Sequence, residues 1–163
     1  MGTAPHPSEL RKKGLAMSLP SEPLRYPTHY PPTTRWKKFF IGVRWLGPDL
    51  SFFKPLHAQQ KNRTADLLGT WGGGARQALA IQLGVIFSRH LHWPSAYFIP
   101  DDRFLVVTGG PRFGMIDNFE IEDAISEIEA SLVGSIGREF WQSTTSLTLS
   151  ELVDRLLEAR APR

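Results

Sequence analysis

A run of apolar residues at helical spacing, just beyond the middle of the chain, constrains the fold more than any other feature. These residues recur three and four positions apart, at Ile121, Ala124, Ile125, Ile128 and Leu132. Such spacing places them on one face of an α-helix. Asp117 is followed three residues later by Glu120, the pattern of an N-terminal capping box. Most other positions are acidic, so residues 117–132 predict a short amphipathic helix with an acidic outer face.

Three further stretches have the spacing of helices. The longest pattern spans residues 75–91. Its apolar stripe comprises Leu79, Leu83, Ile86 and Phe87, broadened by Ala78, Ile81 and Val85. Residues 138–142 suggest a short helix, and Thr148-x-x-Glu151 begins a last helix with a second capping box. Residues 92–116 form a long, partly apolar connection that should cover the core, with a brief extended stretch at residues 104–107. The predicted fold is all-α, with four helices and no strand.

Charge divides the chain of 163 residues into two parts. Residues 1–64 hold 11 Lys and Arg against 3 acidic residues, whereas residues 65–163 hold 8 against 13. Residues 1–34 contain seven of the 13 prolines and no hydrophobic period, which predicts a disordered Pro-rich tail. We therefore expect a tail at 1–34, a basic-aromatic arm and linker at 35–64, and a helical domain at 65–163.

The arm combines aromatic and basic side chains over residues 35–56, with Trp36 and Trp45 among them. We favour packing of these aromatic residues on the chain's own domain, because aromatic side chains near a small core usually belong to it. Binding of the arm to an anionic membrane surface is the next interpretation. Stacking on single-stranded nucleic acid is the least favoured one.

The sequence indicates no catalytic, metal or cofactor site. His90 and His92, with Asp101 and Asp102 downstream, have the composition of a metal site, but residues two apart on a helix point to different faces. Residues 72–74 are three glycines that lack both the preceding strand and the Lys-Ser/Thr of a phosphate-binding loop. The chain has no Cys and no apolar signal-peptide region, so we expect a cytoplasmic location.

Residues 76–160 resemble the acyl carrier proteins in their order of elements. A long helix, a long loop, an acidic second helix, a short third helix and a Thr-capped fourth helix follow one another in both. Asp117-Asn118-Phe119-Glu120 falls on the carrier motif Asp-Ser-Leu-Asp, and Thr148-Leu149-Ser150-Glu151 on the start of the last carrier helix. A Trp-Pro…Phe-x-Pro-Asp-Asp loop is similar to that of bacterial carrier-like families. The resemblance implies a small four-helix bundle of acyl-carrier-protein type.

The chain departs from carriers at the residue that carries their chemistry. A carrier attaches 4′-phosphopantetheine to the motif Ser, and Asn118 occupies that position here. An amide is not a nucleophile for this transfer. The loop before the motif is also about six residues longer than in a carrier. We therefore expect no prosthetic group.

The resulting hypothesis is a non-catalytic, carrier-like domain that acts through protein–protein contact. Carriers dock on basic patches of their partners through the acidic second helix, which implies docking residues Glu120, Asp123 and Glu127. We expect Trp36 and Trp45 of the arm to pack against the domain and to compete with such a partner. Two alternatives stay open: a peripheral membrane or anionic-ligand binder acting through residues 35–56, and an immunity- or antitoxin-like inhibitor.

Overall fold

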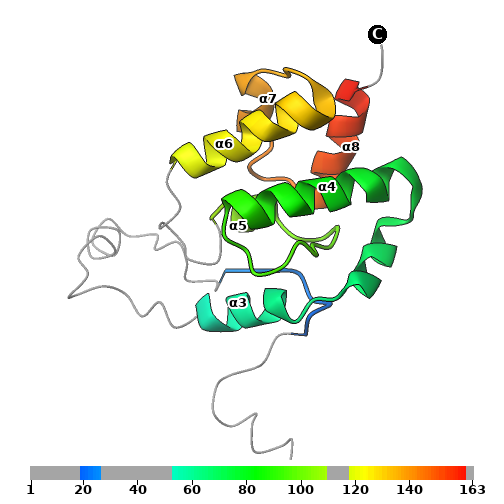
Figure 1. The fold of residues 1–163 in the computed structure, drawn as a ribbon, viewed down its shortest axis with the longest axis vertical. Helices are drawn as coiled ribbons and strands as arrows, with labels where there is room; N and C mark the ends of the chain where they lie inside the picture. The colour runs from blue at the N-terminus through cyan, green and yellow to red at the C-terminus, as the bar shows by residue number, and fades with distance from the viewer. Residues whose placement is uncertain (1–18, 27–52, 110–117, 161–163) are drawn as a thin grey trace, which may run out of the picture.

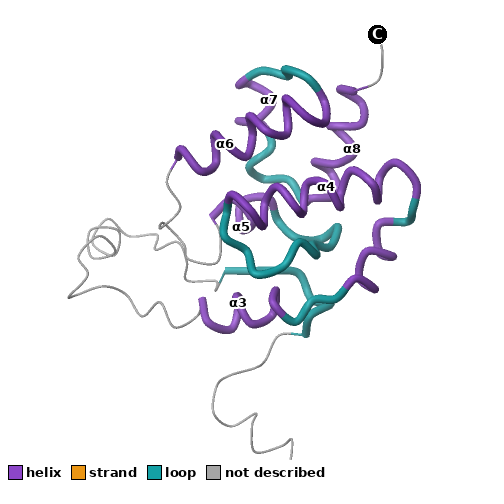
Figure 2. The backbone as a smooth tube through the Cα atoms, viewed as in Figure 1, coloured by secondary structure: helices purple, strands orange, loops and turns teal. Residues whose placement is uncertain are grey.

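The computed structural model describes residues 19–26, 53–109 and 118–160. Within these ranges the chain is predominantly helical and has no strand, only an isolated bridge between Arg103 and Thr148. The helices along the chain are α3 (Phe53–Lys61), the 3₁₀ helix η3 (Ala65–Trp71), α4 (Gly74–His90), α5 (Phe104–Gly109), α6 (Asn118–Ile128), the π-helical turn η4 (Glu129–Val133), α7 (Arg138–Ser143) and α8 (Leu149–Arg160). Figures 1 and 2 show their arrangement. The predicted all-α class is confirmed.

Helix α4 lies at the centre, between α3 on one side and the group of α6, α7 and α8 on the other (Figure 1). The predicted stripe of Leu79, Leu83, Ile86 and Phe87 is buried. Ala78, Ile81 and Val85, which we expected to broaden this stripe, are exposed instead. Their side of α4 has no covering element in the described part of the chain, whereas Ala80 and Gly84 face the core.

Gly84 marks a close approach between α4 and the connection that follows it. A Cβ atom at this position would lie 2.1 Å from the carbonyl oxygen of Ala96. Because the connection runs so close to α4, its aromatic side chains cover this helix. Phe98 packs edge-on against Phe87, with ring centroids 6.1 Å apart, and the Trp93 indole N–H donates to the Val107 carbonyl at 2.9 Å. The expectation that this apolar connection covers the core is confirmed.

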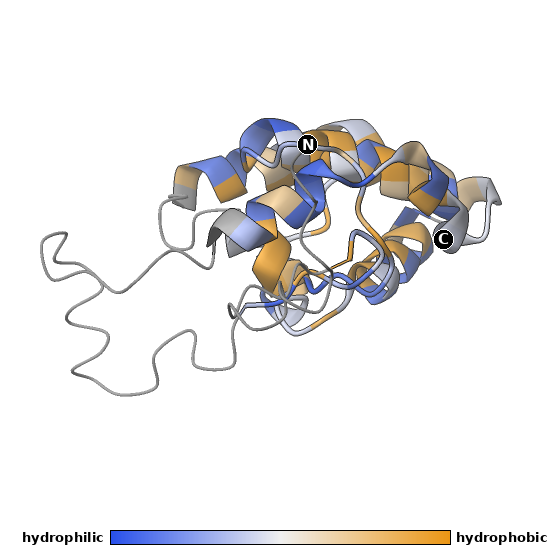
Figure 3. Ribbon diagram, turned by 90° about the horizontal axis from the view of Figure 1, so that it is seen from below, coloured by the Kyte–Doolittle hydropathy of each residue, from blue (hydrophilic) through white to orange (hydrophobic). Residues whose placement is uncertain are grey.

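Helix α6 follows the predicted pattern of burial. Ala124 and Ile128 are buried, and the other apolar positions, Ile121, Ile125 and Leu132, are partly buried against the same core. Figure 3 shows apolar and polar residues alternating along the helices, as expected of amphipathic helices around a shared core. Asp117, half of the capping box predicted for this helix, lies outside the described residues.

The second predicted capping box is present at the start of α8. The Thr148 backbone N–H donates to the Glu151 carboxylate at 2.8 Å, and the Glu151 N–H donates to the Thr148 hydroxyl at 3.3 Å. These reciprocal bonds satisfy two backbone donors that have no partner within the helix. The Thr148 bonds also lower the pKa of Glu151, with the backbone N–H as the largest cause.

The brief extended stretch expected at residues 104–107 is wrong, because these residues begin helix α5. Phe104, Val106 and Val107 are buried, a spacing that fits a short helix as well as a buried strand. Local hydrogen bonds favour the helix: the Val107 N–H donates to the Arg103 carbonyl at 3.1 Å, and the Thr108 hydroxyl donates to the Phe104 carbonyl at 2.9 Å.

The boundary expected at residue 65 also differs from the structure. Residues 53–61, part of the expected arm, form α3, and Leu56 is buried. Residues 19–26, part of the expected tail, place Leu24 in the core with no exposed surface. Residues 53–61 contain few apolar side chains, and residues 19–26 show no hydrophobic period. Their burial depends on partners more than 30 residues away along the chain.

Candidate interaction sites

The three carboxylates predicted to dock a partner lie in different surroundings. Glu127 contacts two residues at the C-terminal end of α4, at 2.7 Å from Arg89 and 2.6 Å from His90. The hydrogen bond from His90 is the main cause that lowers the pKa of Glu127. Glu120 lies 2.7 Å from His92. Asp123 is exposed on the outer side of α6. Glu127 therefore joins α6 to α4, and Glu120 joins α6 to the start of the connection that follows α4.

The candidate metal residues do not come together. His90 and His92 contact different carboxylates of α6, while Asp101 is exposed and Asp102 is buried elsewhere. Across the described ranges no three His, Asp or Glu side chains are grouped to hold a metal ion. Trp36 and Trp45 lie outside the described residues. Asn118 is the first residue of α6, at the position expected from the sequence.

A groove of about 720 Å³ separates α6 from α7 and the turn that follows it. Its apolar lining comes from Ile121, Ile125 and Trp141, and its charged lining from Glu122, Glu129 and Arg138. One charged group is held in place: the Glu129 carboxylate accepts a hydrogen bond from the Trp141 indole N–H at 2.8 Å. Helix α6 thus has two acidic sides: Glu122 faces this groove, whereas Glu127 faces α4.

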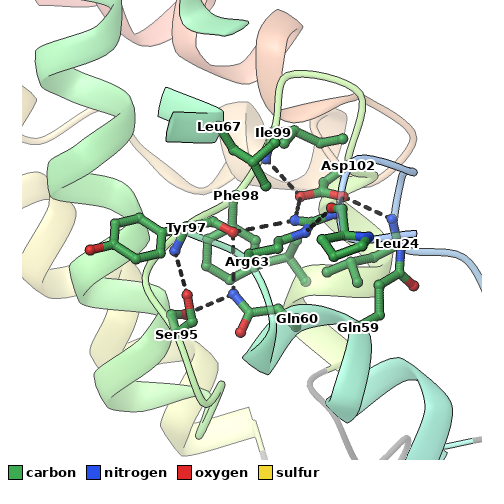
Figure 4. A network of polar contacts seen from close by, with 12 residues as sticks. Leu24, Gln59, Gln60, Arg63, Leu67, Ser95, Tyr97, Phe98, Ile99 and Asp102 are labelled. Atoms are coloured by element: carbon green, nitrogen blue, oxygen red, sulfur yellow. Dashed lines mark hydrogen bonds and ion pairs between the residues drawn. The ribbon is translucent and has the colours of Figure 1, made fainter. Parts of the chain in front are cut away.

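The most extensive polar site is buried on the opposite side of α4 (Figure 4). Arg63, from the turn after α3, forms an ion pair with Asp102, and neither side chain has exposed surface. Asp102 also accepts hydrogen bonds from the backbone N–H groups of Leu24, at 2.8 Å, and Ile99, at 2.9 Å. The carboxylate thus has the several donors that a buried charge requires.

Arg63 and its neighbours on α3 bind backbone carbonyls as well. The Arg63 guanidinium donates to the carbonyls of Pro20, Glu22 and Tyr97 at 3.0, 2.9 and 3.3 Å. Gln60 donates to the Ser95 carbonyl at 2.7 Å. This network joins three stretches that lie far apart in the sequence. Sequence reasoning missed it, because a lone Arg in a polar stretch and the second Asp of an Asp-Asp pair carry no pattern that links them.

No family model matches the chain, and no curated protein and no solved structure matches it either. In the described residues, every helix is too short or too polar to cross a membrane.

Proposed function

We propose that the chain is a non-catalytic, carrier-like interaction domain that binds a protein partner along the groove between α6 and α7. The partner offers a segment with apolar side chains flanked by Lys or Arg. The observation that carries the proposal is the composition of the groove, in which Ile121, Ile125 and Trp141 lie beside acidic residues of α6. Apolar contact supplies binding energy, and complementary charge selects and orients the partner.

The groove also explains which acidic residues would meet a partner. Glu127 is paired with Arg89 of α4, and Glu120 contacts His92 just beyond α4, so both carboxylates already have partners within the chain. Glu122 is exposed and lines the groove. A basic partner segment would therefore approach Glu122 and the neighbouring Asp123 rather than the side of α6 that faces α4.

Charge reversal beside the groove tests this proposal. Glu122→Lys should weaken capture of the partner by roughly tenfold or more, because a like charge then faces the basic segment. Glu158→Lys is the matched control, since it makes the same change at an exposed position on α8. Partners captured by the wild-type chain would be identified by mass spectrometry, and their affinity for both purified variants would be measured. Equal affinity for the two variants would contradict docking at this groove.

The absence of a prosthetic group belongs to the same proposal and is tested separately. The purified chain would be incubated with a broad-specificity phosphopantetheinyl transferase and coenzyme A. Because Asn118 offers no hydroxyl at the carrier position, we expect no gain in mass. Modification of the wild-type chain at any residue would contradict the proposed non-catalytic, carrier-like function.

A further inference from the structure

Residues 19–26 lie across α3 and the connection 95–103 in the manner of a bound peptide (Figure 1). We call these eight residues the N-terminal segment. Nearly all of its polar contacts with the rest of the chain involve its own backbone. Asp102 accepts from the Leu24 N–H, and Arg63 donates to the carbonyls of Pro20 and Glu22. Gln59 donates to the carbonyls of Leu19 and Glu22 at 3.1 and 2.8 Å.

One side chain of the segment is fully enclosed. Leu24 has no exposed surface, whereas Leu19 is 60% exposed. At the other end, the Tyr26 hydroxyl donates to the Val106 carbonyl at 3.3 Å. Recognition through main-chain hydrogen bonds together with a pocket for one apolar side chain is a common way in which proteins bind peptides. Pro20 and Pro23 restrict the free segment and so lower the entropy lost on binding.

The binding groups all belong to the remainder of the fold. Arg63 and Asp102 hold each other, and the Asp102 carboxylate is also fixed by the Ile99 N–H. Gln60 and Arg63 attach the end of α3 to the carbonyls of Ser95 and Tyr97. These contacts do not pass through residues 19–26. The cleft therefore has an ion pair and hydrogen bonds of its own, besides those that it makes with the segment.

The N-terminal segment and α3 are far apart along the chain. Residues 27–52 separate it from α3, so the two are joined by a tether of 26 residues. Such a tether gives an effective concentration in the millimolar range. Binding in cis is therefore favoured even when the intrinsic affinity is modest, and a separate peptide of the same sequence can compete at sufficient concentration.

We propose that this cleft is a peptide-binding site, occupied in cis by residues 19–26, which also accepts the same segment from a second copy of the chain. Its ligand is a short proline-containing segment that places one Leu in the pocket and one backbone N–H on Asp102. The site lies away from the groove between α6 and α7, so this proposal can be tested independently of the proposed function.

The test severs the tether in the folded full-length chain. A protease recognition sequence would replace part of residues 27–52, and the cleaved protein would be analysed by gel filtration. We expect the two pieces to elute together. Added fluorescent peptide of residues 17–28 should then replace the native segment, which fluorescence anisotropy would follow.

Variants are placed in the peptide only, so that folding of the chain is unaffected. A Leu24→Asp peptide should bind at least about a hundredfold more weakly, because a charge would enter the closed pocket. A Leu19→Asp peptide, altered at the exposed position, is the matched control and should bind like the wild type. Separation of the pieces on cleavage, no incorporation of wild-type peptide, or equal binding of the two variant peptides would each overturn the proposal.

Discussion

Two clusters of charged residues lie on either side of α4 and are built differently. In the Arg63–Asp102 cluster both side chains are fully buried, and each has further backbone partners. In the Arg89–Glu127 pair the side chains are 57% and 31% exposed, and His90 shares the carboxylate. Water solvates the second pair but not the first. The same type of ion pair therefore has two roles in this chain. Arg63–Asp102 holds buried segments together, and Arg89–Glu127 links α6 to α4 at the surface.

Because the two ion pairs differ in solvation, breaking them should lower the free energy of unfolding by different amounts. A charge without water must obtain its hydrogen bonds from the protein, and losing one partner leaves the other uncompensated. An exposed charge regains water when its partner is removed. Substitutions of the same kind on the two sides should therefore have very different effects.

The largest effect is expected for Arg63→Met. The substitution leaves the buried Asp102 without its cation and frees the carbonyls of Pro20 and Glu22, so the free energy of unfolding should fall by about 3–5 kcal/mol. Urea denaturation followed by circular dichroism would measure it. A loss below about 1 kcal/mol would mean that the buried cluster contributes no more than an exposed pair.

Gly84→Ala should have the next largest effect, on the same side of α4. A Cβ atom there would meet the carbonyl oxygen of Ala96 at 2.1 Å, a backbone atom that moves only if the connection moves. Overpacking of this kind costs about 1–3 kcal/mol. Thermal unfolding would measure the loss. Gly69→Ala is the control, because a Cβ atom at that position meets no atom within 4 Å.

Loss of the cap on α8 should be smaller. Thr148→Ala removes the hydroxyl that accepts from the Glu151 N–H, and such changes cost about 0.5–2 kcal/mol. The pH dependence has a definite sign, because the pKa of Glu151 is lowered from 4.5 in the folded chain. The Glu151 carboxylate therefore contributes its full stabilisation above pH 4.5, its ordinary pKa. This stabilisation is lost as the pH falls through the lowered pKa of the folded chain. Glu151→Gln should reduce this acid dependence, and urea titrations at pH 3 and pH 6 would show it.

The smallest effect is expected for Arg89→Met, the counterpart of Arg63→Met on the exposed side. Removing one partner of an exposed pair changes the free energy of unfolding by about 0–1 kcal/mol, and salt reduces the difference further. Urea denaturation at low and high salt would measure both values. If Arg89→Met lowered the free energy of unfolding as much as Arg63→Met, the exposed and buried pairs would not differ in their contribution to stability.

Helical period and capping residues made part of the fold predictable. The stripes of α4 and α6 and the Thr148–Glu151 box each lie within one short stretch, so local spacing was enough to locate these helices. The sequence also indicated Glu120 and Glu127 as surface carboxylates. It did not show that Glu127 contacts Arg89 and His90 of α4, or that Glu120 contacts His92 just beyond that helix. The sequence also gave no sign of the groove beside α6, because α6 and α7 form it together.

The sequence by itself determined where the chain forms α4, α6, α7 and α8, because helix formation depends on residues three and four positions apart. Only the tertiary structure decided that residues 19–26 and 53–64 belong to the same core. Leu24, Arg63 and Asp102 lie 39 or more residues from one another in the chain, and no local pattern connects them. Unpaired charges are costly to bury, so Arg63 and Asp102 must lie together, and residues 19–26 add hydrogen bonds to both of them.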